Sequence, residues 1–323
     1  MTGAHSPSTI VLFTLLFVHL FMPNTAIAPH DLKPASAIRA YLGGSFDPVH
    51  KGHLQMAMVV YQHLLPIAEQ QQRDLHVSLL PNARSPFKTH STDPEHRLTM
   101  LKLATQNTPL QIHELELWQA PPVYTIDSVC TLRQRYPNDS LIFIMGMDSA
   151  RSLGQWKDGL KLTDYVNLWI FSRHSMNSTS DTYNDFRADI LVEEDLTKQD
   201  TFALQAQLPA PLQKLIVDSP TALLLPTSRT LTDSSALKSA NKGHIYIDHR
   251  PVVAVSSTQI RQQLQSTENW SNIMPSAKTQ ITSVTPINAI ISNTTSNSFA
   301  KWLNPAVYHY IIAHQLYSAA QFR

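Results

Sequence analysis

The start of the fold is indicated by residues 43–54, Gly43-Gly44-Ser45-Phe46-Asp47-Pro48-Val49-His50-Lys51-Gly52-His53-Leu54. The short apolar segment before it, residues 40–42, predicts a strand. After the stretch, apolar residues recur at helical spacing: Leu54, Met58, Tyr61 and Leu65. Strand, glycine turn and helix in this order form the first unit of an α/β fold.

The residue types of this stretch suit phosphate binding. Glycine lets the backbone approach a ligand closely, and the free amides at a helix start attract an anion. His50 and His53 lie three positions apart at the helix entry, so both imidazoles can face one phosphate. Two histidines at this spacing could instead share a zinc ion, although no third ligand is evident nearby.

The alternation of strands and helices continues downstream. Apolar runs predict strands at residues 76–80, 112–117, 141–145 and 166–171, and helical spacing predicts helices at residues 97–104 and 125–135. Strands that alternate with helices indicate an α/β fold on a doubly wound parallel sheet with right-handed crossovers. One domain is predicted over residues 38–320, with polar, loosely ordered insertions at about 177–242 and 267–298.

Composition narrows the classes of function. The chain has 323 residues, 25 basic and 24 acidic, and its net charge is +1. This balance gives no general field for nucleic acid or for stable membrane association, so any phosphate site must be local. The single cysteine, Cys130, excludes an internal disulfide framework and a zinc site built from cysteines.

A second stretch, Val255-Ser256-Ser257-Thr258-Gln259-Ile260-Arg261, carries hydroxyl groups at the start of a predicted helix. Such groups can cap a helix or bind phosphate. Arg261 presents a forked donor that suits phosphate oxygens. Taken alone, this stretch does not distinguish capping from binding.

Together the two stretches resemble the HxGH and ISSTxIR signatures of the nucleotidylyltransferase superfamily, which implies a Rossmann-like fold. Other segments narrow the resemblance to bacterial nicotinate-nucleotide adenylyltransferases over about residues 38–175 and 243–318. Those segments are Leu80-Pro81-Asn82, Pro86-Phe87-Lys88, Glu95-His96-Arg97-Leu98-Thr99-Met100-Leu101, Tyr124-Thr125-Ile126-Asp127-Ser128, Ile144-Met145-Gly146-Met147-Asp148-Ser149 followed by Leu153 and Trp156, and Leu303-Asn304-Pro305-Ala306-Val307-Tyr308-His309-Tyr310-Ile311 followed by Leu316-Tyr317.

The resemblance implies transfer of AMP from ATP, with its Mg²⁺, to nicotinate mononucleotide, giving deamido-NAD and pyrophosphate. His50 and His53 would be the catalytic residues. The expected ATP-binding residues are Gly43, Gly44, Ser45, Phe46, His50, His53, Ser256, Ser257, Thr258 and Arg261. The expected nicotinate-nucleotide-binding residues are Lys88, Tyr124, Thr125, Asp148, Trp156 and Arg173. No metal site on the protein is expected.

Alternatives stay open at this point. Trp156 could be a core residue, and Asp148 could cap a helix. Phe87 and the segment after Ser172 depart from the family pattern, where His and Arg-Pro-Gly are usual. The acceptor could instead be nicotinamide mononucleotide or phosphopantetheine, or the chain could be an inactive nucleotide-binding sensor.

The first 37 residues are predicted to be an extension. The apolar run at residues 10–22 is short for a membrane span, and Ala26-Ile27-Ala28 resembles a signal-peptidase site. No Lys or Arg precedes the run, which argues against a signal peptide. Because ATP is an intracellular substrate, a non-essential extension and a cytoplasmic location are favoured over export. The sequence is compatible with a homo-oligomer.

Overall fold

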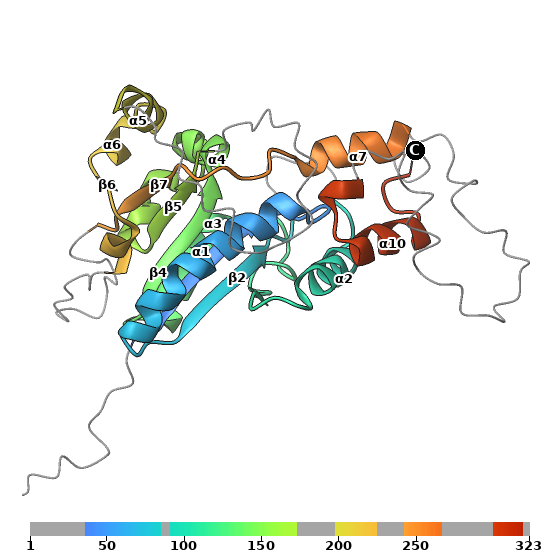
Figure 1. The fold of residues 1–323 in the computed structure, drawn as a ribbon, viewed down its shortest axis with the longest axis horizontal. Coiled ribbons are helices and arrows are strands. Elements are labelled where there is room, and N and C mark those ends of the chain that lie inside the picture. Colours follow the sequence, from blue (N-terminus) through green and yellow to red (C-terminus); the bar gives the residue numbers. More distant parts are fainter. Residues whose placement is uncertain (1–35, 85–90, 173–197, 225–241, 267–299, 319–323) are drawn as a thin grey trace, which may run out of the picture. The chain divides into compact units, whose positions relative to one another are not determined.

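The computed structural model describes residues 36–84, 91–172, 198–224, 242–266 and 300–318 (Figure 1). Its strands form one parallel sheet in the order β3-β2-β1-β4-β5-β7-β6. Their bounds are β1 Ile38–Gly44, β2 Leu75–Pro81, β3 Gln111–Ile112, β4 Ser140–Gly146, β5 Asn167–Phe171, β6 Ile216–Val217 and β7 Ile245–Asp248.

Helices pack on both faces of this sheet. The α-helices are α1 Lys51–Gln70, α2 Pro94–Thr105, α3 Thr125–Arg135, α4 Met147–Arg151, α5 Lys198–Gln205, α6 Ala210–Gln213, α7 Ser257–Ser266 and α10 Pro305–Ala313. Short 3-10 helices are η1 Leu153–Gln155, η2 Gly159–Asp164, η4 Pro220–Leu224 and η5 Ala300–Trp302. None of the helices in the described ranges is long and apolar enough to cross a membrane.

Successive side chains of β1 point to opposite faces of the sheet, and the core accordingly has two layers. Ala40 and Leu42 pack with residues of α1, α2, α7 and α10 on one face. Tyr41 packs with residues of α3, α4 and α6 on the other face. Figure 1 shows α1 running along β1 and β2, with α10 beside α2. The prediction of a doubly wound parallel sheet is therefore confirmed.

Part of the predicted middle insertion belongs to the core. The prediction of loosely ordered chain is wrong for residues 198–224, where β6 pairs with β7. Leu204, Leu208 and Leu212 are at most 4% exposed. They recur at every fourth position, so they give an apolar face that the polar average composition of the segment conceals. The remainder of that insertion, the second insertion and residues 1–35 lie outside the described residues.

One predicted strand is shorter than expected. Residues 112–117 were expected to be extended, but β3 ends at Ile112. The chain then turns, with the amide of Leu117 bonded to the carbonyl of Glu114 and that of Gln119 bonded to Glu116. The turn still buries Leu117, which explains why its apolar pattern resembled that of a strand.

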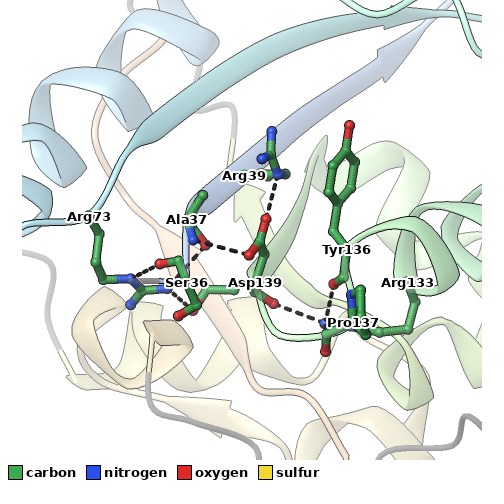
Figure 2. Close-up of polar contacts among 9 residues, drawn as sticks. Ser36, Ala37, Arg39, Arg73, Arg133, Tyr136, Pro137 and Asp139 are labelled. Atoms are coloured by element: carbon green, nitrogen blue, oxygen red, sulfur yellow. Dashed lines mark hydrogen bonds and ion pairs between the residues drawn. The ribbon is translucent and has the colours of Figure 1, made fainter. Parts of the chain in front are cut away.

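A polar network ties the chain together at the amino ends of β1 and β4 (Figure 2). The Asp139 carboxylate accepts bonds from Arg39 at 2.6 Å and from the amide of Ala37 at 3.1 Å. Arg73 donates to the Ser140 hydroxyl at 2.7 Å and to the carbonyls of Ser36 and Ala37. These groups bind one another at the amino ends of the strands, opposite to the carboxyl ends where ligands bind in such sheets. We therefore interpret this cluster as structural.

Candidate active site

The candidate site lies between β1 and β4, where the strand order of the sheet reverses. Strand order runs from β1 toward β2 and β3 on one side, and from β4 toward β5 on the other. In such sheets the crevice beyond the carboxyl ends of the two central strands binds ligands. The loop from Gly44 to His50 follows β1, and Gly146 to Asp148 follows β4. Topology alone therefore brings the two main sequence motifs of the first half of the chain to one place.

Two glycines of the first motif are required by close packing. A Cβ atom on Gly43 would lie 2.4 Å from the Phe143 ring of β4. One on Gly52 would lie 2.8 Å from the carbonyl oxygen of Val253. Gly43 therefore leaves room for the Phe143 ring, and Gly52 lets the segment before α7 approach the start of α1.

The two histidines stack on each other at the start of α1. Their ring centroids are 3.6 Å apart with an interplanar angle of 22°. His50 is the N-cap residue and is 2% exposed. Its backbone amide donates to Nδ1 of His53 at 3.3 Å. A neutral imidazole that accepts at Nδ1 carries its proton on Nε2, so His53 is set to donate from Nε2.

The side chain of Phe46 supports this pair. The residue has a φ of 47°, in the left-handed region, and its ring is 1% exposed. It packs edge-on against His53 with ring centroids 4.9 Å apart. The predicted ATP-binding residue therefore lies against one catalytic candidate, and Gly44 lies against its ring in turn.

The second motif joins the same loop through α7. The Ser257 hydroxyl donates to the carbonyl of Pro48 at 2.9 Å, and Arg261 donates to the carbonyl of Asp47 at 2.5 Å. Arg261 also donates to the Thr258 hydroxyl at 3.2 Å. Ser256 acts differently, because its hydroxyl and amide exchange bonds with Gln259 in a helix cap.

Several of the residues predicted to bind the nicotinate nucleotide lie at the start of α3 and after α4. Tyr124 is the N-cap residue of α3 and Thr125 its first residue. Lys157 lies over the Tyr124 ring at 4.5 Å and pairs with Asp127 at 3.1 Å. Trp156 is half-buried, and its indole donates to the Ser152 hydroxyl at 3.1 Å. The sequence patterns did not single out Lys157, which links these two segments.

Asp148 does not cap α4. The N-cap residue of this helix is Gly146, and the exposed carboxylate of Asp148 pairs with Arg151. The helix-cap alternative for Asp148 is therefore wrong. Lys88, Arg173 and Phe87 lie outside the described residues. Within the described ranges no group of three or more His, Cys, Asp or Glu side chains is placed to hold a metal ion.

Comparisons with known proteins agree with this geometry. Residues 41–263 match the cytidylyltransferase-like family. A probable nicotinate-nucleotide adenylyltransferase of Idiomarina loihiensis is 30% identical over 235 residues, which cover 72% of this chain and 90% of that protein. The chain belongs to the nicotinate-nucleotide adenylyltransferase family.

Two further comparisons cover other shares of the chain. A nicotinate-nucleotide adenylyltransferase of Bacillus subtilis is 42% identical over 130 residues, 39% of this chain and 62% of that protein. A solved structure of Plasmodium falciparum nicotinic acid mononucleotide adenylyltransferase complexed with APC covers 87% of this chain and 97% of its own, with 16% identity and a TM-score of 0.48.

In this family member, a buried arginine that was not predicted as a site residue holds the loops of the site. Arg97 of α2 is 0% exposed. Its guanidinium donates to the carbonyls of Ser45, Asn82, Ala83 and Thr92 at 2.6–3.0 Å. Those carbonyls belong to the loop after β1, the loop after β2 and the segment before α2. One cation thereby binds three separate stretches of backbone.

Glu116 is a second buried group in this family member that the sequence did not single out. Burial raises its pKa from an ordinary value of 4.5 to about 7. The folded protein therefore favours protonated Glu116. The stability that this gives is complete below the unfolded-state pKa and is lost as pH rises through about 7.

Glu116→Gln should remove this dependence, because glutamine stays neutral. Urea unfolding should give similar stabilities for wild type and variant near pH 4. At pH 8 the variant should be more stable, by about 3 kcal/mol at 1.36 kcal/mol per pKa unit. Glu114→Gln, in the same turn but exposed, is the control and should show no such gain. If the free energy of unfolding changed with pH in the same way for wild type and Glu116→Gln between pH 4 and pH 8, the raised pKa of Glu116 would be refuted.

Proposed function

We propose that this chain transfers the AMP group of ATP to nicotinate mononucleotide, giving deamido-NAD and pyrophosphate. The observation that carries the proposal is the stacked His50–His53 pair at the start of α1, beside the Ser257 and Arg261 side chains of α7. This arrangement brings the two imidazoles and the Arg261 guanidinium to the loop at the switch point of the sheet. Family membership supplies the acceptor.

The nucleophile in this reaction is the phosphate of nicotinate mononucleotide, which is already anionic. One of its oxygens forms a bond to the α-phosphorus of ATP, while the bond from that phosphorus to the bridging oxygen breaks and pyrophosphate leaves. No general base is required, so positioning and charge stabilisation do the catalysis. His50 and His53 would donate to the α-phosphate oxygens, where charge accumulates in the transition state.

The departing phosphates would lie against α7. Arg261 has five N–H donors, and only some of them are used by Asp47 and Thr258. The remainder would bind the β- and γ-phosphates together with the hydroxyl of Thr258. The Ser257 hydroxyl would join them by exchanging its bond to the Pro48 carbonyl for one to a phosphate oxygen. Gly43, Gly44, Ser45 and Phe46 would line the path of ATP. Ser256 would contribute through its amide and its helix cap.

Mg²⁺ would accompany ATP as a triphosphate complex. The described residues offer no cluster of three ligands, and Mg²⁺ with nucleotides is ordinarily held through phosphate oxygens and water. The ion would neutralise part of the pyrophosphate charge. The chain's own part there would be the placement of Arg261 and the α7 hydroxyls.

The acceptor would bind between α3 and the segment after α4. Trp156 would stack on the pyridine ring, and Tyr124 with Thr125 would offer amides at the start of α3 to its carboxylate. Asp148 would meet a ribose hydroxyl, with Lys88 and Arg173 near the acceptor phosphate. A cytoplasmic location follows from the use of ATP, and ATP with nicotinate mononucleotide are the partners proposed.

The test is pyrophosphate release from ATP with one acceptor at a time. Nicotinate mononucleotide should give the highest kcat/KM. Faster release with nicotinamide mononucleotide or phosphopantetheine would replace the proposed acceptor. Binding of ATP without release for any acceptor would favour the sensor alternative. Identification of the dinucleotide product by mass confirms which bond has formed.

A further inference from the structure

Asp47 lies at the centre of contacts from three distant segments. Its carboxylate is 4% exposed. One oxygen accepts from the Tyr317 hydroxyl at 2.7 Å and the other from the amide of Thr92 at 3.2 Å. Its backbone carbonyl accepts from Arg261. Because both carboxylate oxygens and the carbonyl are bonded within the protein, Asp47 ties the loop to these three segments.

Tyr317 is built into this position. It is 0% exposed, and its φ of 64° lies in the left-handed region, which a tyrosine rarely adopts. Such backbone conformations persist where the surrounding structure fixes them. Burial and the neighbouring Asp47 carboxylate raise the pKa of Tyr317 well above its ordinary value, so the hydroxyl remains a donor. Thr92 also bonds to it through its side chain.

The contact leads directly to the histidine pair. Asp47 is followed by Pro48, whose carbonyl accepts from Ser257, and then by Val49 and His50. Any displacement of the Asp47 backbone therefore moves the N-cap of α1 and the anchor of Arg261 together. The stacked rings, only 3.6 Å apart, depend on the position of that N-cap, because the His50 amide holds Nδ1 of His53.

We propose that Tyr317 is a positioning residue for adenylyl transfer: through the Asp47 carboxylate, its hydroxyl holds the loop that orients His50 and His53. The inference rests on the proposed function for its effect on turnover. Its structural part, the orientation of the two rings, stands independently of any substrate.

The experiment compares Tyr317→Phe with Tyr310→Phe. Tyr310 lies on α10, shortly before Tyr317 in the sequence. Its hydroxyl contacts His96 at 2.8 Å and not the loop that contains Asp47. Tyr317→Phe should lower kcat about 10-fold, the scale of one hydrogen bond to a charged group. The KM for nicotinate mononucleotide should stay within about twofold, because the predicted acceptor residues lie elsewhere. Tyr310→Phe should keep wild-type kcat.

Two further readouts separate positioning from simple stability. In NMR spectra assigned with His50→Asn and His53→Asn variants, the ring resonances of both histidines should move in Tyr317→Phe and stay in place in Tyr310→Phe. Asp47→Asn should reduce kcat, and adding Tyr317→Phe to it should cause little further loss.

Unchanged kcat and unchanged histidine resonances in folded Tyr317→Phe would overturn the inference, even if its melting temperature fell. A wild-type protein that releases no pyrophosphate with nicotinate mononucleotide would instead overturn the proposed function. The NMR comparison would then still decide whether Tyr317 orients the pair.

Discussion

Replacing His50 or His53 with alanine should lower kcat by about 10²–10³-fold, the usual effect of losing one transition-state donor. The binding of nicotinate mononucleotide should change far less, since the proposed acceptor contacts lie at α3 and near Trp156. The two imidazole rings also stack on each other, with their centroids 3.6 Å apart, so loss of one ring removes a packing partner of the other. The double variant should therefore lose less than the sum of the two single losses in free energy, as groups that act as a unit do.

Steady-state kinetics with ATP and nicotinate mononucleotide measures these effects, with thermal melts to confirm folding. His309→Ala, which changes an exposed histidine on α10, is the matched control and should retain wild-type kcat. Arg261→Ala should differ from the histidine variants by raising the KM for ATP as well as lowering kcat. Near-normal kcat in a folded double histidine variant would remove the basis of the proposed mechanism.

Arg97→Met should destabilise the fold by about 3–5 kcal/mol, the cost of breaking a buried charged network. The substitution keeps an apolar stem but leaves four carbonyls, those of Ser45, Asn82, Ala83 and Thr92, without their donor. Arg97→Lys should recover only part of the loss, because an ammonium group cannot span carbonyls from three segments as the planar guanidinium does.

Urea unfolding with linear extrapolation measures this change. Lys102→Met, on the same helix but exposed, controls for loss of a cation and should lie within about 0.5 kcal/mol of wild type. A fall in stability for Arg97→Met no larger than for Lys102→Met would show that the carbonyls find other partners. The loop from Gly44 to His50 would then be held by the other contacts described above, those of Asp47 with Thr92 and Tyr317 and those of α7 with Asp47 and Pro48.

The fold and the centre of the site follow from local patterns. Strand, glycine turn and helix around Gly43 to Leu54 repeat a pattern that permits few topologies, and parallel topology places the carboxyl ends together. The supporting contacts could not be read in this way. The bonds from Arg97 and Tyr317 join positions whose local sequences do not specify each other as partners. The polar average composition of residues 198–224 conceals the leucines at every fourth position, Leu204, Leu208 and Leu212, so composition alone does not predict that these residues pack in the core.

The hydrogen bond from Tyr317 to Asp47 spans 270 positions of the chain. At roughly 5–20 residues per second, a ribosome needs roughly 15–50 s to add that length of polypeptide. Throughout this interval the nascent chain already contains its histidine pair but lacks the residue that fixes their loop. The contact that orients the pair can therefore form only long after the pair itself has been synthesised, and a product terminated before residue 317 would contain both signature motifs without that contact.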